Sequence, residues 1–262
     1  MSLNITVIGC GRMGSAIVQA LIKSGYSVAA VEKNSETGSP SREVKGFYRD
    51  ISLSPPSDVY IFAVKPGDIK GALSELKSAG GLSGDPVIIS VAAGVTVSMI
   101  KKITGTGRVA RVMPNTPALL GAGMSCVCFP DASEDEYKTV EKLFSTMGET
   151  QRVGEEQMNA VTALSGSGPA YVYLMGEVMK RFAEKKGFSG EEAERLAAQT
   201  VYGAGVMMRS SGESFEKLRK NVTSPGGTTE AAVKHLKEEG FDRILADAIA
   251  KASLRASELV KE

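Results

Sequence analysis

A glycine-rich segment near the start of the chain has the spacing of a dinucleotide-binding turn. The apolar run Ile5-Thr6-Val7-Ile8 leads directly into Gly9-Cys10-Gly11-Arg12-Met13-Gly14, a G-x-G-x-x-G motif that a helical pattern follows. In this setting the first glycine permits the tight turn, the second lets the backbone approach a pyrophosphate, and the third packs helix against strand. The start of the helix offers unpaired N–H groups to the phosphates. The predicted contacts are Gly9, Gly11, Arg12, Met13 and Gly14.

An acidic residue follows at the distance expected for a ribose contact. Glu32 closes a second apolar run, Val28–Val31, and an acid at this point binds the ribose hydroxyls. Its carboxylate would repel the 2′-phosphate of NADP and therefore favours NAD. Side chains that could bind that phosphate follow closely, namely Lys33, Asn34, Ser35 and Arg42. We predict that Glu32, Lys33 and Asn34 contact the cofactor, while the choice between NADPH and NADH stays open.

Two further segments are expected to border the cofactor, because ligands of open α/β sheets bind beyond the carboxyl ends of the strands. Ala63-Val64-Lys65-Pro66 ends one apolar run, although Lys65 by itself is equally consistent with a solvated lysine in a turn. Ala92-Ala93-Gly94 follows another run. Its small side chains leave space for a flat nicotinamide ring.

The most distinctive polar segment is a turn cluster late in the chain. Leu218–Ala231 contains the run Thr223-Ser224-Pro225-Gly226-Gly227-Thr228-Thr229 and opens into a helical pattern. Free N–H groups and hydroxyls at the positive end of a helix form a natural receptor for a carboxylate. An ordinary capped helix explains the same residues, because Thr228 or Thr229 with Glu230 would cap well. Spacing alone does not separate the two interpretations.

The elements that must position these residues differ between the two parts of the chain. The first part alternates apolar runs with helical stretches, which is typical of a parallel sheet with crossover helices. Strands are expected over Asn4–Ile8, Ser27–Val31, Asp58–Val64, Pro86–Val91, Arg108–Met113 and Met124–Phe129. Helices are expected over Met13–Ser24, Asp68–Ser78 and Glu134–Met147. We therefore predict an α/β, Rossmann-type, dinucleotide-binding domain over residues 1–153.

Residues 154–262 are predicted to form an all-α domain that binds substrate and dimerises. Helical patterns cover Gln157–Leu164, Pro169–Lys186, Glu191–Arg209 and Phe241–Val260. Two of them are apolar on nearly every face, and such helices must be covered on every side. A domain of this size cannot hide both, so we expect a homodimer formed through the C-terminal helices. A well-packed monomer is the alternative.

Composition indicates a cytoplasmic protein whose partner is a small molecule. Lys and Arg number 31 against 30 Asp and Glu, and no basic run could follow a nucleic acid or an anionic membrane. No apolar run is long enough to span a membrane, and no secretory leader is recognisable. Cys10, Cys126 and Cys128 form no disulfide framework. With His235 the only histidine, no metal site is expected.

Three motifs follow one another after the Rossmann half. They are Arg111-Val112-Met113-Pro114-Asn115-Thr116-Pro117, Ala163-Leu164-Ser165-Gly166-Ser167-Gly168-Pro169-Ala170-Tyr171, and the Leu218–Ala231 segment. On these residues the chain resembles pyrroline-5-carboxylate reductases over nearly its whole length. The resemblance implies reduction of 1-pyrroline-5-carboxylate to L-proline with NADPH or NADH, the last step of proline biosynthesis. It also implies subunits that interleave through their helical domains, often in a ring of dimers, with active sites between subunits.

Carried over position by position, the resemblance implies roles for single residues. The substrate carboxylate would be held by backbone N–H groups of Ser224, Gly226, Gly227, Thr228 and Thr229. The Thr229 hydroxyl would lie near the ring nitrogen as the catalytic group, and Glu155 would help to bind the substrate. Asn115 and Asn221 would contact the cofactor, Asn221 beside its nicotinamide end.

The chain departs from the family pattern at two positions. Phe215 stands where proline is common before the turn cluster, and Asp50 stands where an asparagine often touches the cofactor ribose. Neither position touches the reaction centre. The second departure leaves the choice of cofactor more open.

Hydride transfer to a protonated cyclic imine asks for positioning and a dry pocket more than for proton chemistry, since an iminium is already electrophilic. His235 is accordingly expected to be structural. A β-hydroxyacid dehydrogenase also joins a Rossmann half to a helical half, but it needs a lysine early in the second domain, and none occurs from Pro169 to Met179. A reductase of another small cyclic imine and a non-catalytic dinucleotide sensor remain as alternatives.

Overall fold

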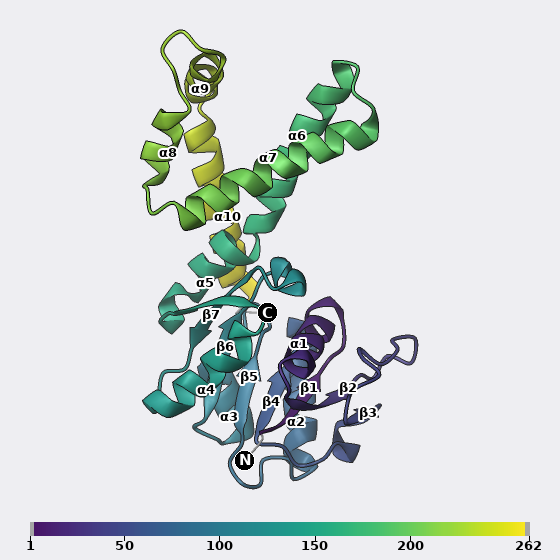
Figure 1. Cartoon of the computed structure of the whole chain (residues 1–262). Coiled ribbons are helices and arrows are strands. Elements are labelled where there is room, and N and C mark those ends of the chain that lie inside the picture. The colour runs from purple at the N-terminus through teal and green to yellow at the C-terminus, as the bar shows by residue number, and fades with distance from the viewer. Residues whose placement is uncertain (1–2, 260–262) are drawn as a thin grey trace. The chain divides into compact units, whose positions relative to one another are not determined.

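The computed structural model describes residues 3–259, which divide into two compact units. Of the described residues, the first unit contains 3–167 and 252–259, and the second is Gly168–Lys251. Figure 1 shows the sheet and helices of the first unit and the helices of the second. The boundary predicted after residue 153 falls inside the first unit, where Met158 is fully buried in the core of the sheet.

The first unit is built on an eight-stranded sheet in the order β3-β2-β1-β4-β5-β6-β7-β8. Its strands are β1 (Asn4–Ile8), β2 (Ser27–Val31), β3 (Gly46–Tyr48), β4 (Val59–Phe62), β5 (Val87–Ser90), β6 (Val109–Met113), β7 (Gly123–Cys128) and β8 (Gly148–Arg152). Neighbouring strands run parallel except β6 and β7, which are antiparallel. The predicted Rossmann-type architecture is confirmed.

Helices cover both faces of this sheet. Helices α1 (Arg12–Lys23) and α4 (Glu134–Ser145) pack on one face, and α2 (Ile69–Ser78), α3 (Val97–Thr104) and α5 (Met158–Val161) pack on the other. Strands buried on both faces are apolar at successive positions, which is why β1, β4, β5 and β6 appear as largely apolar runs in the sequence, with buried polar exceptions such as Thr6 and Arg111. Because β1, β2, β4 and β5 are parallel, their carboxyl ends lie along the same side of the sheet.

Several elements lie outside the sequence-based expectations. They are β3, α3, β8, the helix α8 described below, and the short helical turns η1 (Ile51–Leu53), η2 (Pro66–Asp68), η3 (Thr116–Leu120) and η4 (Glu155–Gln157). The strands β3 and β8 form the two edges of the sheet. Edge strands are half-exposed, and β8 has no buried residue, so hydrophobic patterning does not reveal it.

One further turn, η5 (Thr162–Gly166), is π-helical and overlaps the end of the predicted helical stretch 157–164. The Ser167 N–H donates to the Thr162 carbonyl at 2.8 Å, five residues back, as a π-helical turn requires. Such turns occur often at functional sites. This one overlaps the sequence motif Ala163–Tyr171.

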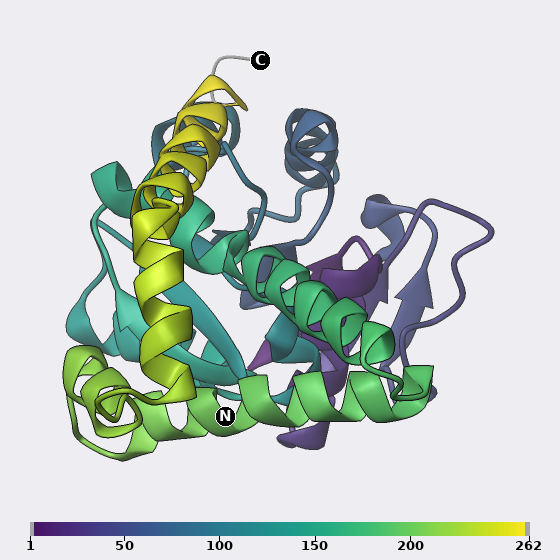
Figure 2. The ribbon, with the colours of Figure 1, turned by 90° about the horizontal axis from the view of Figure 1, so that it is seen from above.

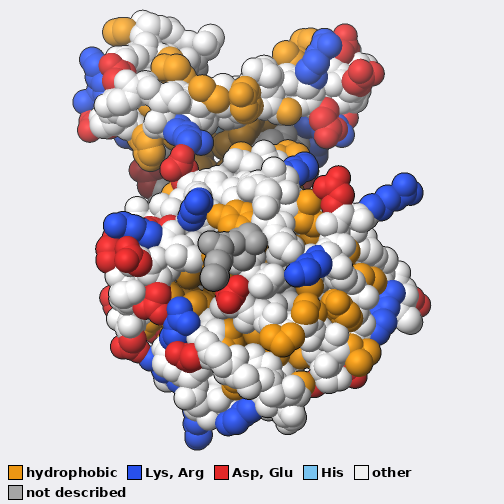
Figure 3. All heavy atoms as spheres, turned by 60° about the horizontal axis from the view of Figure 1, so that its bottom comes forward, with side chains coloured by type: hydrophobic (Ala, Val, Ile, Leu, Met, Phe, Trp, Pro, Cys, Tyr) orange, Lys and Arg blue, Asp and Glu red, His pale blue; other side chains and the backbone are white. Residues whose placement is uncertain are grey.

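The second unit consists of α6 (Gly168–Lys185), α7 (Gly190–Ser210), α8 (Phe215–Asn221), α9 (Thr228–Glu238) and the first part of α10 (Phe241–Leu259). Figure 2 shows α6 and α7 joined by a tight turn. Among the residues of this unit, all of which the structure describes, only Ala193 and Ala197 are buried. Large apolar side chains are exposed along α6 and α7, for example Phe182 at 63% and Tyr202 at 66%, and Figure 3 shows such surface in orange.

The helical unit therefore lacks a hydrophobic core in a single copy of the chain. A helix pair of this composition is stable only when another surface covers it. Among the described residues, no helix is long and apolar enough to cross a membrane. The described part of the chain also holds no cluster of three or more residues suited to bind a metal ion.

Candidate active site

The glycine-rich turn adopts the predicted strand, turn and helix arrangement between β1 and α1. Gly9 has φ 93°, and a Cβ at this position would lie 2.8 Å from the carbonyl oxygen of Ala63. A Cβ on Gly14 would lie 1.9 Å from the carbonyl oxygen of Gly9, whereas one on Gly11 would meet nothing within 4 Å. Gly9 and Gly14 are thus required by the fold itself. The open space at Gly11 is what a bound ligand would need.

The amino end of α1 is free to receive an anion. Gly11 is the residue that precedes the helix, and no side chain hydrogen-bonds to the first turn. That turn also contains no acidic residue. Uncapped N–H groups and the helix dipole together favour a phosphate at this position.

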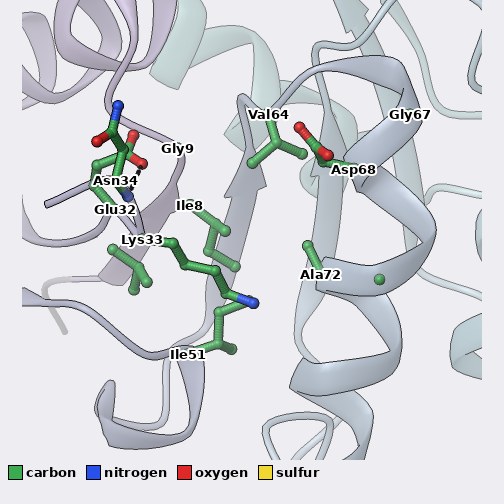
Figure 4. A pocket seen from close by; sticks show the side chains of 12 residues that line it. Ile8, Gly9, Glu32, Lys33, Asn34, Ile51, Val64, Gly67, Asp68 and Ala72 are labelled. Carbon is green, nitrogen blue, oxygen red and sulfur yellow. Dashed lines mark hydrogen bonds between the residues drawn. The ribbon is translucent and has the colours of Figure 1, made fainter. Parts of the chain in front are cut away.

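A cavity of about 490 Å³ lies beside this turn, between the ends of β1 and β2 and the start of α2. It is lined by Ile8, Gly9, Val31, Glu32, Lys33, Asn34, Ile51, Val64, Gly67, Asp68, Gly71 and Ala72. Figure 4 shows apolar side chains at its base and the charged Glu32, Lys33 and Asp68 around it. Apolar walls with a few polar groups suit the adenosine half of a dinucleotide.

Glu32 is held in place by the backbone. Its Oε2 accepts a hydrogen bond from the Cys10 N–H at 2.7 Å, and its Oε1 accepts one from the Asn34 N–H at 2.9 Å. The carboxylate therefore ties the end of β2 to the glycine-rich turn. Burial, followed by the nearby Glu32 charge, raises the pKa of the Cys10 thiol to about 12, so this thiol stays protonated and chemically inert.

The cationic groups near Glu32 already have partners in the chain. Lys33 pairs with Glu75 on α2. The guanidinium of Arg49, which no sequence motif marks, donates to the backbone carbonyls of Glu32, Asn34 and Thr37 at 3.1, 2.6 and 2.9 Å. Arg49 thus fixes the loop after β2. Hydrogen bonds from the Ser52 side chain and backbone lower the pKa of Asp50, which keeps a further negative charge near this loop.

The two predicted strand-end segments lie at the same edge of the sheet. Ala63 contacts the glycine-rich turn, and Ala92 is fixed by a hydrogen bond from its N–H to the buried Ser90 hydroxyl at 3.2 Å. Gly94 has φ 73°, and a Cβ there would lie 2.8 Å from the Cβ of Leu259, near the end of α10. Both segments thus border the space beyond the carboxyl ends of β4 and β5.

Glu155 lies in the first unit, on the turn η4. Its Oε1 accepts a hydrogen bond from Arg111 at 2.7 Å, and its Oε2 accepts one from the Val97 N–H at 3.2 Å. Arg111 lies on β6 and is 1% exposed. Burial, then the Glu155 charge, raises the pKa of the neighbouring Cys128 thiol to about 11. No sequence pattern predicted that Arg111 and Glu155 would form a pair.

Asn115 also has partners inside the first unit. Its side-chain oxygen accepts from the Met124 N–H at 2.9 Å, and its amide nitrogen donates to the Ser165 carbonyl at 3.2 Å. Asn115 thereby joins the start of β7 to the π-helical turn η5. In the second unit, Asn221 donates to Glu213 at 2.8 Å.

The turn cluster Ser224–Thr229 leads into α9 in the second unit. Gly227 is the residue before the helix, no side chain caps the first turn, and Gly226 has φ 70°. Glu230 instead reaches back to the Gly226 N–H at 2.7 Å, and the Gly227 N–H donates to the Ser224 carbonyl at 3.0 Å. The capped-helix interpretation with Thr228 or Thr229 as cap is therefore not what the structure adopts. The uncapped helix start is suited to a carboxylate.

Comparison with known proteins gives the same assignment along the whole chain. Residues 155–259 match the family model for pyrroline-5-carboxylate reductase dimerisation, and residues 4–94 match that for NADP oxidoreductase, coenzyme F420-dependent. The pyrroline-5-carboxylate reductase of Arabidopsis thaliana is 37% identical, over 98% of this chain and 96% of the relative. The chain belongs to the pyrroline-5-carboxylate reductase family.

Solved structures of pyrroline-5-carboxylate reductases are similar in fold throughout. The enzyme of Coxiella burnetii is 36% identical with a TM-score of 0.90, over 100% of both chains. The Plasmodium falciparum reductase, solved with NADP bound, is 26% identical with a TM-score of 0.88, over 98% of both chains. Residues 155–259 of this chain, which match the dimerisation model, contain the exposed apolar helices, and this chain forms a homo-oligomer.

Proposed function

We propose that this chain reduces 1-pyrroline-5-carboxylate to L-proline with a hydride from NADPH or NADH, the last step of proline biosynthesis. The observation that carries the proposal is the pairing, in a member of this family, of an open dinucleotide turn at Gly11 with the uncapped start of α9. The first feature fits the hydride donor, and the second fits the carboxylate of the imino acid.

The residues of the first unit fit a nicotinamide dinucleotide from end to end. We assign the pyrophosphate to the amino end of α1, the adenosine to the cavity beside Glu32, Lys33 and Asn34, and the nicotinamide half to the strand-end segments. Those segments are Ala63–Pro66 and Ala92–Gly94. When bound, the reduced nicotinamide supplies the hydride. Asn115 and Asn221 remain predicted cofactor contacts.

The substrate carboxylate is assigned to the start of α9. The N–H groups of Gly226 and Gly227 are engaged within the turn, so those of Thr228 and Thr229 in the first turn of α9 are the better placed donors. The Thr229 hydroxyl is assigned to orient the ring nitrogen. Ser224 shapes the turn through its carbonyl. Glu155 was predicted to bind substrate, but its partners are Arg111 and the Val97 N–H.

The reaction requires little from the protein beyond orientation and exclusion of water. The protonated ring nitrogen makes the C=N carbon electrophilic, so a hydride adds there and the nitrogen keeps its proton. No general base is needed. His235 is exposed on α9, and its structural role stays a prediction.

NADPH is the expected principal donor. The Plasmodium falciparum relative binds NADP, and residues 4–94 match an NADP oxidoreductase model. NADH is kept as a second donor, because the fixed carboxylate of Glu32 suits an unmodified ribose hydroxyl. We further propose that the homo-oligomer is a ring of dimers and that the enzyme works in the cytoplasm, where its buried free cysteines would stay reduced.

The proposal is tested by initial rates of NADPH and, separately, NADH oxidation on addition of 1-pyrroline-5-carboxylate, with proline identified as the product. Rapid turnover is expected with at least one donor. Turnover only with another cyclic imine would redirect the assignment to that substrate. Cofactor binding without turnover on any cyclic imine would favour the dinucleotide sensor and overturn the proposal.

A further inference from the structure

Arg111, which is buried, forms an ion pair with Glu155, whose side chain is 32% exposed, and the proposed reaction does not use this pair. Arg111 lies in the row of side chains formed by Phe62, Ser90 and Cys128, since these residues are register partners on β4, β5, β6 and β7. Figure 1 shows β5, β6 and β7 side by side. Phe62 and Ser90 are the last residues of their strands. The guanidinium therefore lies beneath the edge of the sheet at which the cofactor is assigned.

The charge of Arg111 is compensated by a single acceptor. Its side chain is 2% exposed, one of its nitrogens donates to Glu155, and its Nε and remaining nitrogen have no partner among the described residues. A buried guanidinium of this kind depends strongly on its one carboxylate. Because the buried guanidinium of Arg111 has no other acceptor, it holds the Glu155 carboxylate in one orientation.

The other oxygen of Glu155 fixes the loop that precedes α3. It accepts a hydrogen bond from the Val97 N–H, the first N–H of that helix, where the helix dipole also favours a negative charge. The loop from Val91 to Thr96 is therefore anchored at both ends, by Ser90 through the Ala92 N–H and by Glu155 through Val97. Between these anchors lie Ala92–Gly94.

We propose that the Arg111–Glu155 pair is a positioning device for the nicotinamide end of the cofactor, in which Arg111 orients Glu155 and Glu155 holds the β5–α3 loop. This inference rests on the proposed function in that it takes Ala92–Gly94 to contact the nicotinamide. It assigns Glu155 to positioning of the cofactor. It also assigns a positioning role to Arg111, for which the sequence predicted no role.

The variant Glu155→Gln tests the device, because glutamine has one acceptor oxygen and can serve Arg111 or Val97 but not both. Calorimetric titrations with NADPH and with 2′-phospho-ADP-ribose, which lacks only the nicotinamide, separate the two ends of the cofactor. We expect affinity for NADPH to fall about tenfold, the size of one lost charge-assisted hydrogen bond. Affinity for the fragment should stay unchanged, since its contacts lie at α1 and β2.

A matched control is Glu136→Gln. Glu136 also accepts a hydrogen bond from an arginine at 2.7 Å, and its side chain is 27% exposed, against 32% for Glu155. Its partner Arg108 directly precedes β6 and therefore lies at the amino end of that strand, away from the assigned cofactor site. Glu136→Gln should lower the melting temperature and leave both affinities unchanged. The pair is then shown to act on the loop and not through stability in general.

Should Glu155→Gln not fold, the double variant Arg111→Met with Glu155→Leu carries the test, because it removes both charges together. It should fold and still show the selective loss of NADPH affinity, since Val97 has lost its acceptor. Equal losses for NADPH and the fragment, or wild-type affinity for both, in whichever variant folds would refute the inference. Neither result depends on turnover of the imine, so a failure of the proposed reaction remains distinguishable.

Discussion

Replacing Gly14 by alanine would place a methyl carbon 1.9 Å from the carbonyl oxygen of Gly9. Real Cβ contacts are not found below 3.0 Å, so α1 would have to withdraw from the glycine-rich turn by about 1 Å. The clashing atom belongs to the backbone and cannot rotate away. A shift of this size at a site that orients a reactant costs about 10²-fold in kcat/KM, and such overpacking costs about 1–3 kcal/mol of stability.

Gly11→Ala is the matched comparison within the same turn. A Cβ at Gly11 meets nothing within 4 Å, and its φ of −64° and ψ of −169° suit alanine. The free protein should therefore keep its melting temperature. The added methyl would occupy the space assigned to the pyrophosphate, so NADPH affinity should fall.

The assay combines differential scanning fluorimetry of the free proteins with calorimetric titration of NADPH. Gly14→Ala should lose both stability and affinity, and Gly11→Ala should lose affinity alone. Wild-type affinity in Gly11→Ala would refute the reasoning, because the pyrophosphate could not then lie against that residue. Wild-type stability in Gly14→Ala would show that the turn is not packed as described.

Three further perturbations follow from the structure. Thr229→Ala should lose about 1–3 kcal/mol of transition-state stabilisation while Thr229→Ser loses little, and a wild-type kcat/KM in the alanine variant would exclude a role for the hydroxyl. Phe182→Glu, on an exposed apolar face of α6, should break up the oligomer, as light scattering after gel filtration would reveal. Hydrogen bonds from the Ser133 side chain and backbone, and then from Arg108, lower the pKa of Glu136 from 4.5 to about 2. The contribution of Glu136 to the stability of the fold is therefore complete above pH 4.5 and is lost as the pH falls toward 2. Thermal unfolding between those pH values should therefore depend less on pH in Glu136→Gln.

The strands and helices at the centre of the first unit were predictable from the sequence, because burial on both faces makes them largely apolar runs. The expected strand Asn4–Ile8 and the next, Ser27–Val31, agree with the structure at both ends. The edge strand β8 was not predictable, since Gly148–Arg152 has no residue that the core requires. Helix α3 was missed because it is short and begins with a β-branched residue, Val97, which favours strands in isolation.

The residues of the candidate site also divide into those that were predictable from the sequence and those that were not. The glycine positions were predictable, because a turn that must avoid side chains restricts the residue type itself. The partners of Glu32 and Glu155 were not, since each pairing joins residues far apart in the chain through the packing of separate elements. Nothing in the local sequence around Arg49 indicates that it binds the carbonyls of the loop after β2.

The near absence of buried residues in Gly168–Lys251 has a consequence for the life of the protein in the cell. With only Ala193 and Ala197 buried, this unit gains almost no free energy from folding alone, so completion of the fold and assembly must be one event. The melting temperature should then rise with protein concentration. Subunits should exchange slowly between finished oligomers, because a departing chain must expose what its partner covered. Two variants of this chain made in one cell would form mixed oligomers while they are synthesised, and would exchange subunits only slowly after that.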